Sequence, residues 1–394
     1  MKRRILKPVL ALFVSLLVLG GLTACGNQDK PADGGKAKVK VAVVCDSAGK
    51  NDNGYNQSAV AGLEKAGAEF GIETKVVEPT TGVPQALEAL ADDGYNLIFN
   101  LEYDFEALIK GTGGAKPLAE QYPDTTFVVF NDNPNVDESG NLIHKNVISC
   151  LFDVNQSSYV AGALSVLVNE NAQELFGDGY NFTSVDDGGR SIGFIGGTNS
   201  NGITVFSYGF IEGINHMADK LGVDYDYYAK YDAGFSDSAT GSSIAGTFYN
   251  QGANVVFSVA GNVGDGAAAK AKEAGKLAIH VDANKDAQQP GYILTSVIKN
   301  TEVPVYDITK ALCDGKIADM PNTQTFSLAS GATSITDLKT IEEHVVDSGK
   351  PKFEEIKSEV KEIEGQINDG TIKVIDAQAG DTFDPATCPH VVIK

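Results

Sequence analysis

The sequence VKVAVVCDSAGKNDNGYNQS, residues 39–58, shows how this protein is built. It begins with an almost continuously apolar run, Val39 to Cys45, which predicts a strand that is buried on both faces. A polar stretch rich in Asp, Asn, Ser and Gly follows, and a helical pattern begins at Gln57. In a parallel sheet, such loops at the carboxyl ends of strands carry the groups that face a ligand. The stretch therefore predicts an α/β fold with a ligand site beside this loop.

The same alternation of short apolar runs and helical periodicity continues along the chain. Strands are predicted at residues 39–45, 74–77, 97–101, 126–130 and 147–152, and again at 191–195, 225–231, 255–259 and 277–281. Helices are predicted at residues 57–70, 83–92, 105–121, 158–169, 205–221, 238–251, 264–274 and 352–367, with one more strand and helix at 293–316. Buried strands joined by crossover helices indicate parallel, doubly wound sheets. A chain of this length exceeds one hydrophobic core, so two lobes are expected.

The N-terminus has the pattern of an export signal. Four basic residues precede an apolar run over residues 8–21, and small residues surround Cys25. This pattern resembles a bacterial lipoprotein signal, which implies cleavage after residue 24 and acylation of the Cys25 thiol. An ordinary secretory signal or an uncleaved anchor, with Cys25 as a bystander, is the alternative, but the run is shorter than the ~20 residues of a spanning helix. Residues 1–24 are therefore expected to be a signal peptide and residues 25–37, polar and rich in Gly, a flexible tether.

The charge balance of the chain excludes some partners. Without the four basic residues of the signal, 27 Lys and Arg stand against 52 Asp and Glu, a net charge of −25. Binding of nucleic acid or of an anionic membrane surface relies on clustered Lys and Arg, so neither is expected. The acidic balance is read as a solvated surface.

Four further cysteines follow Cys25, namely Cys45, Cys150, Cys313 and Cys388. They could pair in three ways, and none shows the close spacing of a zinc or redox site. At most one disulfide is expected. Buried apolar thiols are an equal alternative for Cys45 and Cys150, which lie in predicted strands.

Polar residues stand at the ends of the predicted strands. They are Asp46 in the first loop, then Asn100 and Glu102, Asn131 and Asp132, the glycine-rich run 260–266, and Asp282. For Asp52 and Asn56 helix capping is favoured over ligand contact. The glycine-rich run lacks the Lys-Ser/Thr of a phosphate loop and the dinucleotide spacing, so its glycines indicate a tight turn or a close backbone approach.

No catalytic constellation is evident in the sequence. The five histidines are scattered, and neither metal-ligand spacing nor a known nucleophile motif is present. Asp46, Asp132 and Asp282 could in principle converge as paired carboxylates, and a hydrolase would need Asp46, Asn131 and Asp282 to form an acid/base or metal cluster. No cofactor and no metal are expected, and a binding protein is favoured over an enzyme.

The run Asp46 to Ser58, taken with later blocks, resembles the BMP or PnrA-like family of bacterial substrate-binding lipoproteins. The blocks include NVIS (146–149) with YVAG (159–162), GFIGG (193–197), FSYGF (206–210), FSD (235–237) and TSVIK (295–299). The resemblance covers residues 38–315 and implies the periplasmic-binding-protein type I fold, with two doubly wound lobes and a ligand cleft between them. It implies an N-terminal lobe of residues 38–152 plus 293–320 and a C-terminal lobe of residues 153–292 plus 321–394.

The resemblance also implies roles for single residues. Tyr55 and Phe206 match the two aromatic residues that stack on a purine base, Asp46 matches a polar contact, and Asp282 with Lys299 match the pair that holds the ribose hydroxyls. Asn131 or Asp132 takes the place of the residue at the purine edge, and the register leaves open which of them faces the cleft. The predicted ligand-binding set is completed by Ser47, Asn56 and Gly261. Core packing is the alternative role for Phe206, and a salt bridge between the lobes is the alternative for Lys299.

The function that follows is a lipid-anchored receptor outside the cytoplasm. It would capture a nucleoside, a purine nucleoside first of all, by lobe closure and deliver it to an ABC transporter permease with its ATPase. The chain is expected to be a monomer. Alternatives are a receptor of the same fold for a sugar or a signalling molecule that feeds a sensor and, less favoured, a surface nucleoside hydrolase.

Overall fold

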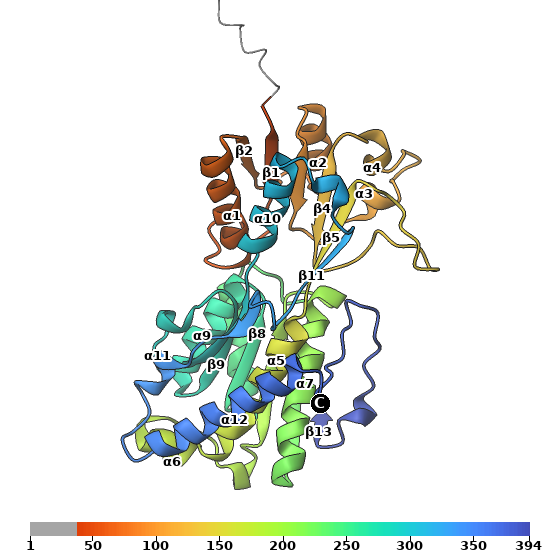
Figure 1. Ribbon diagram of the computed structural model, residues 1–394. Helices are drawn as coiled ribbons and strands as arrows, with labels where there is room; N and C mark the ends of the chain where they lie inside the picture. Colours follow the sequence, from red (N-terminus) through yellow and green to blue (C-terminus); the bar gives the residue numbers. More distant parts are fainter. Residues whose placement is uncertain (1–37) are drawn as a thin grey trace, which may run out of the picture. The chain divides into compact units, whose positions relative to one another are not determined.

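The computed structural model describes residues 38–394 of the protein. The predicted signal peptide, the tether and the lipidation site at Cys25 lie outside the described residues. Within residues 38–394, no helix combines the length and the apolar character that crossing a bilayer would need. Residues 39–394 form one compact unit that contains two β-sheets, each flanked by helices (Figure 1).

The first sheet has six parallel strands in the order β11-β5-β4-β3-β1-β2. The strands are β1 (Lys40–Val44), β2 (Glu73–Val77), β3 (Leu97–Asn100), β4 (Thr126–Phe130), β5 (Val147–Phe152) and β11 (Thr323–Phe326). The helices packed with them are α1 (Tyr55–Phe70), α2 (Val83–Asp92), α3 (Glu106–Ile109), α4 (Leu118–Gln121) and α10 (Glu302–Cys313). We call this sheet with its helices the first lobe.

The second sheet has seven strands in the order β12-β10-β9-β8-β6-β7-β13, and only β12 runs antiparallel to its neighbour. The strands are β6 (Ser191–Gly196), β7 (Tyr225–Lys230), β8 (Val255–Val259), β9 (Leu277–Asp282), β10 (Ile293–Lys299), β12 (Thr333–Ile335) and β13 (Val391–Ile393). The helices are α5 (Val154–Glu170), α6 (Ala172–Phe176), α7 (Asn201–Leu221), α8 (Ser238–Asn250), α9 (Asn262–Ala274), α11 (Lys339–Glu342) and α12 (Lys350–Asn368). We call this sheet with these α-helices the second lobe.

Short 3₁₀ helices lie at Gly177–Gly179, Val185–Asp187, Asp286–Gln288, Ile317–Asp319 and Pro385–Thr387.

The strands have continuous apolar sequences because both faces of each sheet are covered. In β1, Val41 and Val43 belong to one hydrophobic cluster, whereas Ala42 and Val44 belong to another. Successive side chains of a strand point to opposite faces, so a strand between two layers of helices needs apolar residues at every position. The predicted α/β class with parallel sheets is confirmed.

Helices α5 and α7 pack so closely that glycine is needed where they meet. A Cβ atom on Gly162 would lie 2.3 Å from the carbonyl oxygen of Phe210, and one on Gly213 would lie 1.9 Å from that of Tyr159. Gly162 belongs to the block YVAG, which carries part of the family resemblance. The physical role of both glycines is to let two backbones approach beneath the second sheet.

One predicted helix, residues 105–121, is wrong. The structure has two short helices there, α3 and α4, separated by a turn in which Gly111, Gly113 and Gly114 adopt φ values of 77°, 61° and 85°. Pro117 precedes α4. Left-handed glycines and a proline end a helix, and here they override the apolar periodicity on both sides.

The strand pairing also corrects the expected lobe boundaries. Residues 293–320 were expected in the first lobe, but β10 pairs with β9 and β12 in the second sheet, and the chain crosses over only after Lys299. Helix α10 then packs beside α1 (Figure 1). Strand β11, expected in the second lobe, pairs with β5 in the first sheet. A buried strand has the same apolar sequence in either sheet, so its own residues do not select its partner.

The chain therefore crosses between the lobes three times. The first crossing is at Asp153, between β5 and α5, the second lies between β10 and α10, and the third lies between β11 and β12. Two of these crossings touch, because the backbone N–H of Asp153 donates to the carbonyl of Phe326 at 2.9 Å. Three adjacent crossings are an arrangement that allows two lobes to open and close as rigid bodies.

The four cysteines among residues 38–394 are free thiols. Cys45 and Cys150 are fully buried, at the end of β1 and in β5. Burial, reinforced by nearby carboxylates, raises the pKa of Cys45 to about 12, so this thiol stays protonated at neutral pH.

Candidate functional site

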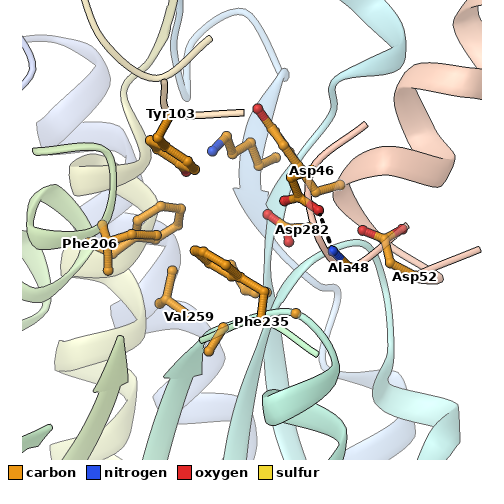
Figure 2. Close-up of a pocket in the computed structure, with 14 residues that line it drawn as sticks. Asp46, Ala48, Asp52, Tyr103, Phe206, Phe235, Val259 and Asp282 are labelled. Atoms are coloured by element: carbon orange, nitrogen blue, oxygen red, sulfur yellow. Dashed lines mark hydrogen bonds between the residues drawn. The ribbon is translucent and has the colours of Figure 1, made fainter. Parts of the chain in front are cut away.

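The carboxyl ends of strands from both lobes meet around one small cavity of about 20 Å³ (Figure 2). Six of the ten predicted ligand-binding residues line it, namely Asp46, Tyr55, Phe206, Gly261, Asp282 and Lys299. The first lobe also contributes Ala48, Asp52 and Tyr103, and the second lobe Ile203, Phe235, Val259, Ala260 and Val281. A cavity of this volume holds about one water molecule, so the structure is that of a closed cleft.

The loop after β1 is held by a network of hydrogen bonds that fixes Asp46. Asn56 accepts from the Asp46 backbone at 2.9 Å and donates to its carboxylate at 2.6 Å. Asp52 accepts from the backbone N–H groups of Gly54, Asn56 and Gln57 and so caps α1, as expected. Asn56 does not line the cavity and instead positions Asp46.

The carboxyl group of Asp46 is close to its titration point at neutral pH. Burial is the largest cause and raises its pKa to about 7, while the hydrogen bonds from Asn56 and Ala48 act in the opposite direction. The carboxyl group can therefore accept a hydrogen bond as a carboxylate or donate one as an acid.

Lys299, at the end of β10, is a buried cation surrounded by aromatic rings. Its side chain is 2% exposed, and its Nζ lies 4.8 Å from the centroid of Tyr55 and 5.4 Å from those of Phe152 and Phe206. It forms no ion pair and no hydrogen bond with other groups in residues 38–394. Burial lowers its pKa to about 8, against the opposing attraction of two carboxylates. A buried ammonium without a hydrogen-bond acceptor is costly, and this one faces the cavity.

Asp282 supplies a carboxylate to the cavity wall (Figure 2). Burial raises its pKa to about 6, whereas Lys299 and Lys285 favour the ionised form. Its backbone has φ 74°, and Asn131 at the end of β4 has φ 68°. Both residues turn the chain sharply at the end of a strand, in a conformation that Asp and Asn adopt more easily than most residues.

Tyr55 and Phe206 line the cavity and are also anchored in the cores of their own lobes. Tyr55 is 6% exposed, and its hydroxyl donates to the carbonyl of Leu101 at 3.2 Å. Phe206 is 1% exposed and packs edge-on against Phe257. Each ring therefore combines a place in the cavity wall with core packing.

A second aromatic pair, which the sequence analysis did not single out, spans the cleft. Tyr103 of the first lobe and Phe235 of the second lobe are parallel, with centroids 6.2 Å apart and an interplanar angle of 0° (Figure 2). Both rings are only half-buried. Tyr103 lies just beyond Asn100 and Glu102 at the end of β3, and Phe235 lies in a block quoted for the resemblance. Their strand-end positions were the signal that could have identified them.

Asn131 lies behind the rings of Tyr55 and Tyr103. Its amide donates to the hydroxyls of Tyr55 at 2.8 Å and Tyr103 at 3.1 Å, and its Oδ1 is buried without a partner among residues 38–394. Asp132 is turned away and accepts from the backbone of Asn133. Neither residue lines the cavity in this closed form, and Ser47 is exposed outside it.

The two lobes also touch directly around the cavity. A Cβ atom on Gly202, at the start of α7, would lie 2.7 Å from Cε1 of Tyr103 and 2.9 Å from Cβ of Asn131. Nζ of Lys285, a residue that is 3% exposed, lies 3.5 Å from the backbone carbonyl of Asp52. These contacts must separate before a larger ligand can enter.

The turn at Gly261 holds the backbone of Phe235 in place. It has φ 50°, and the next residue, Asn262, donates its backbone N–H to the carbonyl of Phe235 at 2.8 Å. A side chain at Gly261 would be strained by this left-handed backbone. Among residues 38–394, no three or more His, Cys, Asp and Glu side chains gather where they could hold a metal ion.

Two α/β lobes joined by three crossings, with a cavity lined from both lobes at the strand ends, define the periplasmic-binding type I fold. A crystal structure with the same architecture is that of an ABC transporter solute-binding protein from Aeropyrum pernix K1, with a TM-score of 0.69 over 89% of this chain and 95% of that chain, at 21% identity.

This chain belongs to the family described as ABC transporter substrate-binding protein PnrA-like, whose model matches residues 38–367. A relative named ABC transporter nucleoside-binding protein BmpA, from Lactococcus lactis subsp. cremoris, is 29% identical over 95% of this chain and 99% of its own length. An uncharacterized lipoprotein of Pyrococcus horikoshii is 29% identical over 79% of this chain and 73% of its own length. The resemblance inferred from the sequence is confirmed, and the family consists of binding proteins rather than enzymes.

Proposed function

We propose that this protein captures a purine nucleoside between its lobes and delivers it to an ABC transporter permease. The parallel pair of Tyr103 and Phe235 carries the proposal, because the two rings come from opposite lobes, lie in parallel planes and have centroids 6.2 Å apart. A planar base in contact with both rings needs about 7 Å between the ring planes, twice the usual carbon–carbon contact distance of about 3.5 Å. Opening of the lobes would separate the two rings, and closure would bring them onto opposite faces of a base.

The charged groups beside the rings suit a ribose. Lys299 has no acceptor among residues 38–394, and Asp282 and Asp46 supply carboxyl oxygens at the same cavity. Hydroxyl groups can donate to a carboxylate and accept from an ammonium at once. A sugar diol would thus give these buried groups the hydrogen bonds that a purely apolar ligand could not. The name of the nucleoside-binding relative from Lactococcus lactis supports the same ligand class.

A thermal-shift panel tests this proposal. Inosine, guanosine and adenosine should each raise the melting temperature, because a ligand that binds only the folded form at a thousandfold excess over Kd stabilises it by about 4 kcal/mol. The 2′-deoxynucleosides should bind roughly 5- to 150-fold more weakly, since a buried charge would lose a partner worth about 1–3 kcal/mol. Free ribose and glucose are the controls for a sugar receptor. Shifts with the sugars and none with any nucleoside would reject the purine ligand.

We further propose that the acyl chain on Cys25 anchors the receptor to a cell membrane, facing outside the cytoplasm. The name of the lipoprotein relative from Pyrococcus horikoshii supports a lipid anchor. In cells, the full-length protein should be found in the membrane fraction and a Cys25→Ser variant in the soluble fraction. An unchanged membrane fraction for the variant would contradict the anchor.

A further inference from the structure

The chain after α12 forms a segment that reaches the boundary between the lobes. We call residues 372–383 the C-terminal strap; in Figure 1 it belongs to the blue to violet loop beside α7. The family match ends at residue 367, before the strap begins. The family model therefore assigns it no role.

The strap is fixed to the second lobe by contacts along its length. Glu212 of α7 accepts the backbone N–H of Ile375 at 2.9 Å, and Asn155 of α5 donates to the carbonyl of the same residue at 2.9 Å. Farther along, the ring of Phe383 stacks on Tyr208 of α7, with centroids 4.6 Å apart and an angle of 9°. The strap thus moves with the second lobe.

One strap residue reaches across to the first sheet. Gln378 is 6% exposed, and its Oε1 accepts the backbone N–H of Phe152, the last residue of β5, at 3.3 Å. Strand β11 pairs with Phe152 on one side of β5, but β4 on the other side ends at Phe130, which pairs with Cys150, so the β4–β5 ladder does not extend to Phe152. Gln378 supplies the acceptor that this buried backbone group needs.

Phe152 connects this contact to both the crossings and the cavity. It directly precedes Asp153, the first crossing, and its ring stacks on Phe326 next to the third crossing at 5.3 Å. Its ring centroid also lies 5.4 Å from Nζ of Lys299 in the cavity wall. A change in the position of Phe152 is therefore a change at the hinge and beside the ligand.

We propose that Gln378 is a positioning residue that stabilises the closed arrangement of the lobes through the backbone of Phe152. Opening at Asp153 would carry β5 away from a strap that is fixed to α5 and α7. The hydrogen bond would then be present in the closed form and broken in the open form. A hydrogen bond that forms in only one of two states stabilises that state, and its free energy shifts the populations of the two states. The strap would set ligand affinity without touching the ligand.

The test measures lobe opening directly. In the full chain carrying Cys25→Ser and Cys313→Ser, spin labels at Glu120→Cys in α4 and Lys272→Cys in α9, both exposed, report the distance between the lobes. Gln378→Met keeps the length of the side chain and removes the acceptor. Without any ligand, this variant should shift the label distances to longer values. Gly202→Ala serves as a standard for the open form, because its Cβ would collide with Tyr103.

The matched control is Gln173→Met, which changes an exposed glutamine of α6. It should leave the distances and the affinity unchanged. Gln378→Met should in addition raise the Kd for inosine about tenfold, a readout that rests on the proposed nucleoside function, whereas the label distances do not. Distances for Gln378→Met that equal those of the control would overturn the proposal, with or without a lower melting temperature.

Discussion

Replacing Lys299 by methionine should abolish nucleoside binding and at the same time raise the melting temperature of the unliganded protein. The ammonium group is buried, faces the cavity and lacks an acceptor among residues 38–394. Without it, the hydroxyls of a ribose would lose their cationic partner, and we expect Kd to rise at least a hundredfold. Methionine has a similar length and carries no charge, so the free protein would no longer contain a desolvated cation.

The gain in stability should depend on pH in a defined direction. The pKa of Lys299 falls from 10.5 to about 8 in the folded protein, so the unfolded chain binds more protons between these values. The buried ammonium therefore lowers the free energy of unfolding of the wild type by its full amount below pH 8, and this loss becomes smaller as the pH rises from 8 towards 10.5. We expect a gain of about 1–3 kcal/mol at pH 7, since each pKa unit corresponds to about 1.4 kcal/mol and Asp282 loses a favourable neighbour. Melting curves of both proteins between pH 6 and 10 measure the difference.

Lys276 provides a matched control. It is also buried, at 5% exposed, and burial also lowers its pKa to about 8. Its Nζ, however, donates to Asn254 at 2.6 Å and to Thr183 at 2.9 Å, away from the cavity. Lys276→Met should therefore lower stability and leave the affinity for inosine unchanged. If Lys299→Met bound inosine as the wild type does, Lys299 would have no role in the site.

The second large effect is expected for the aromatic pair across the cleft. Phe235→Ala should weaken nucleoside binding roughly 10- to 100-fold, because stacking of a base on an aromatic ring contributes about 1–3 kcal/mol. Its melting temperature without ligand should change little, since the ring is half-buried and lies at the cleft. Titration calorimetry with inosine and a thermal melt of the same sample measure the two quantities.

Two further phenylalanines make this experiment decisive. Phe70→Ala removes a half-buried ring that packs on Tyr306, far from the cavity lining, and should leave affinity unchanged. Phe206→Ala removes a ring that is 1% exposed and should lower both stability and affinity. Phe206→Ala could instead lower only the affinity while Phe235→Ala changes neither affinity nor stability. The base would then stack between Tyr55 and Phe206, as the sequence resemblance implied.

Single elements show where the sequence interpretation succeeded and where it did not. The strands at 126–130, 147–152 and 255–259 have the predicted bounds. Polar residues flank the first two on both sides, and Asn254 precedes the third, which ends before Ala260 and Gly261. The helix predicted at 105–121 is two short helices, because three left-handed glycines outweigh the apolar periodicity. That error was avoidable, since glycine and proline are local signals.

For some residues of the candidate site the sequence indicated the role, and for others only the structure shows it. Asp46 and Asp282 were recognisable because polar residues directly at the ends of buried strands face the cleft of a parallel sheet, whereas Lys299 was indicated only by the family resemblance. Asn131 also directly follows a strand, yet it holds the two tyrosine hydroxyls from behind, and Asn56, in the first turn of α1, holds Asp46. Strand-end position alone does not separate a residue that faces the cavity from one that supports it.

The sequence by itself determined the order of the first ten strands, the α/β class and the polar strand ends. Burial on both faces of a sheet leaves a continuous apolar run in the chain, which can be read locally. Only the tertiary structure decided that β10 joins the second sheet and that Tyr103 faces Phe235. Both depend on how segments distant in sequence are placed in space, and neither strand pairing nor the meeting of two loops is encoded in the residues of one segment alone.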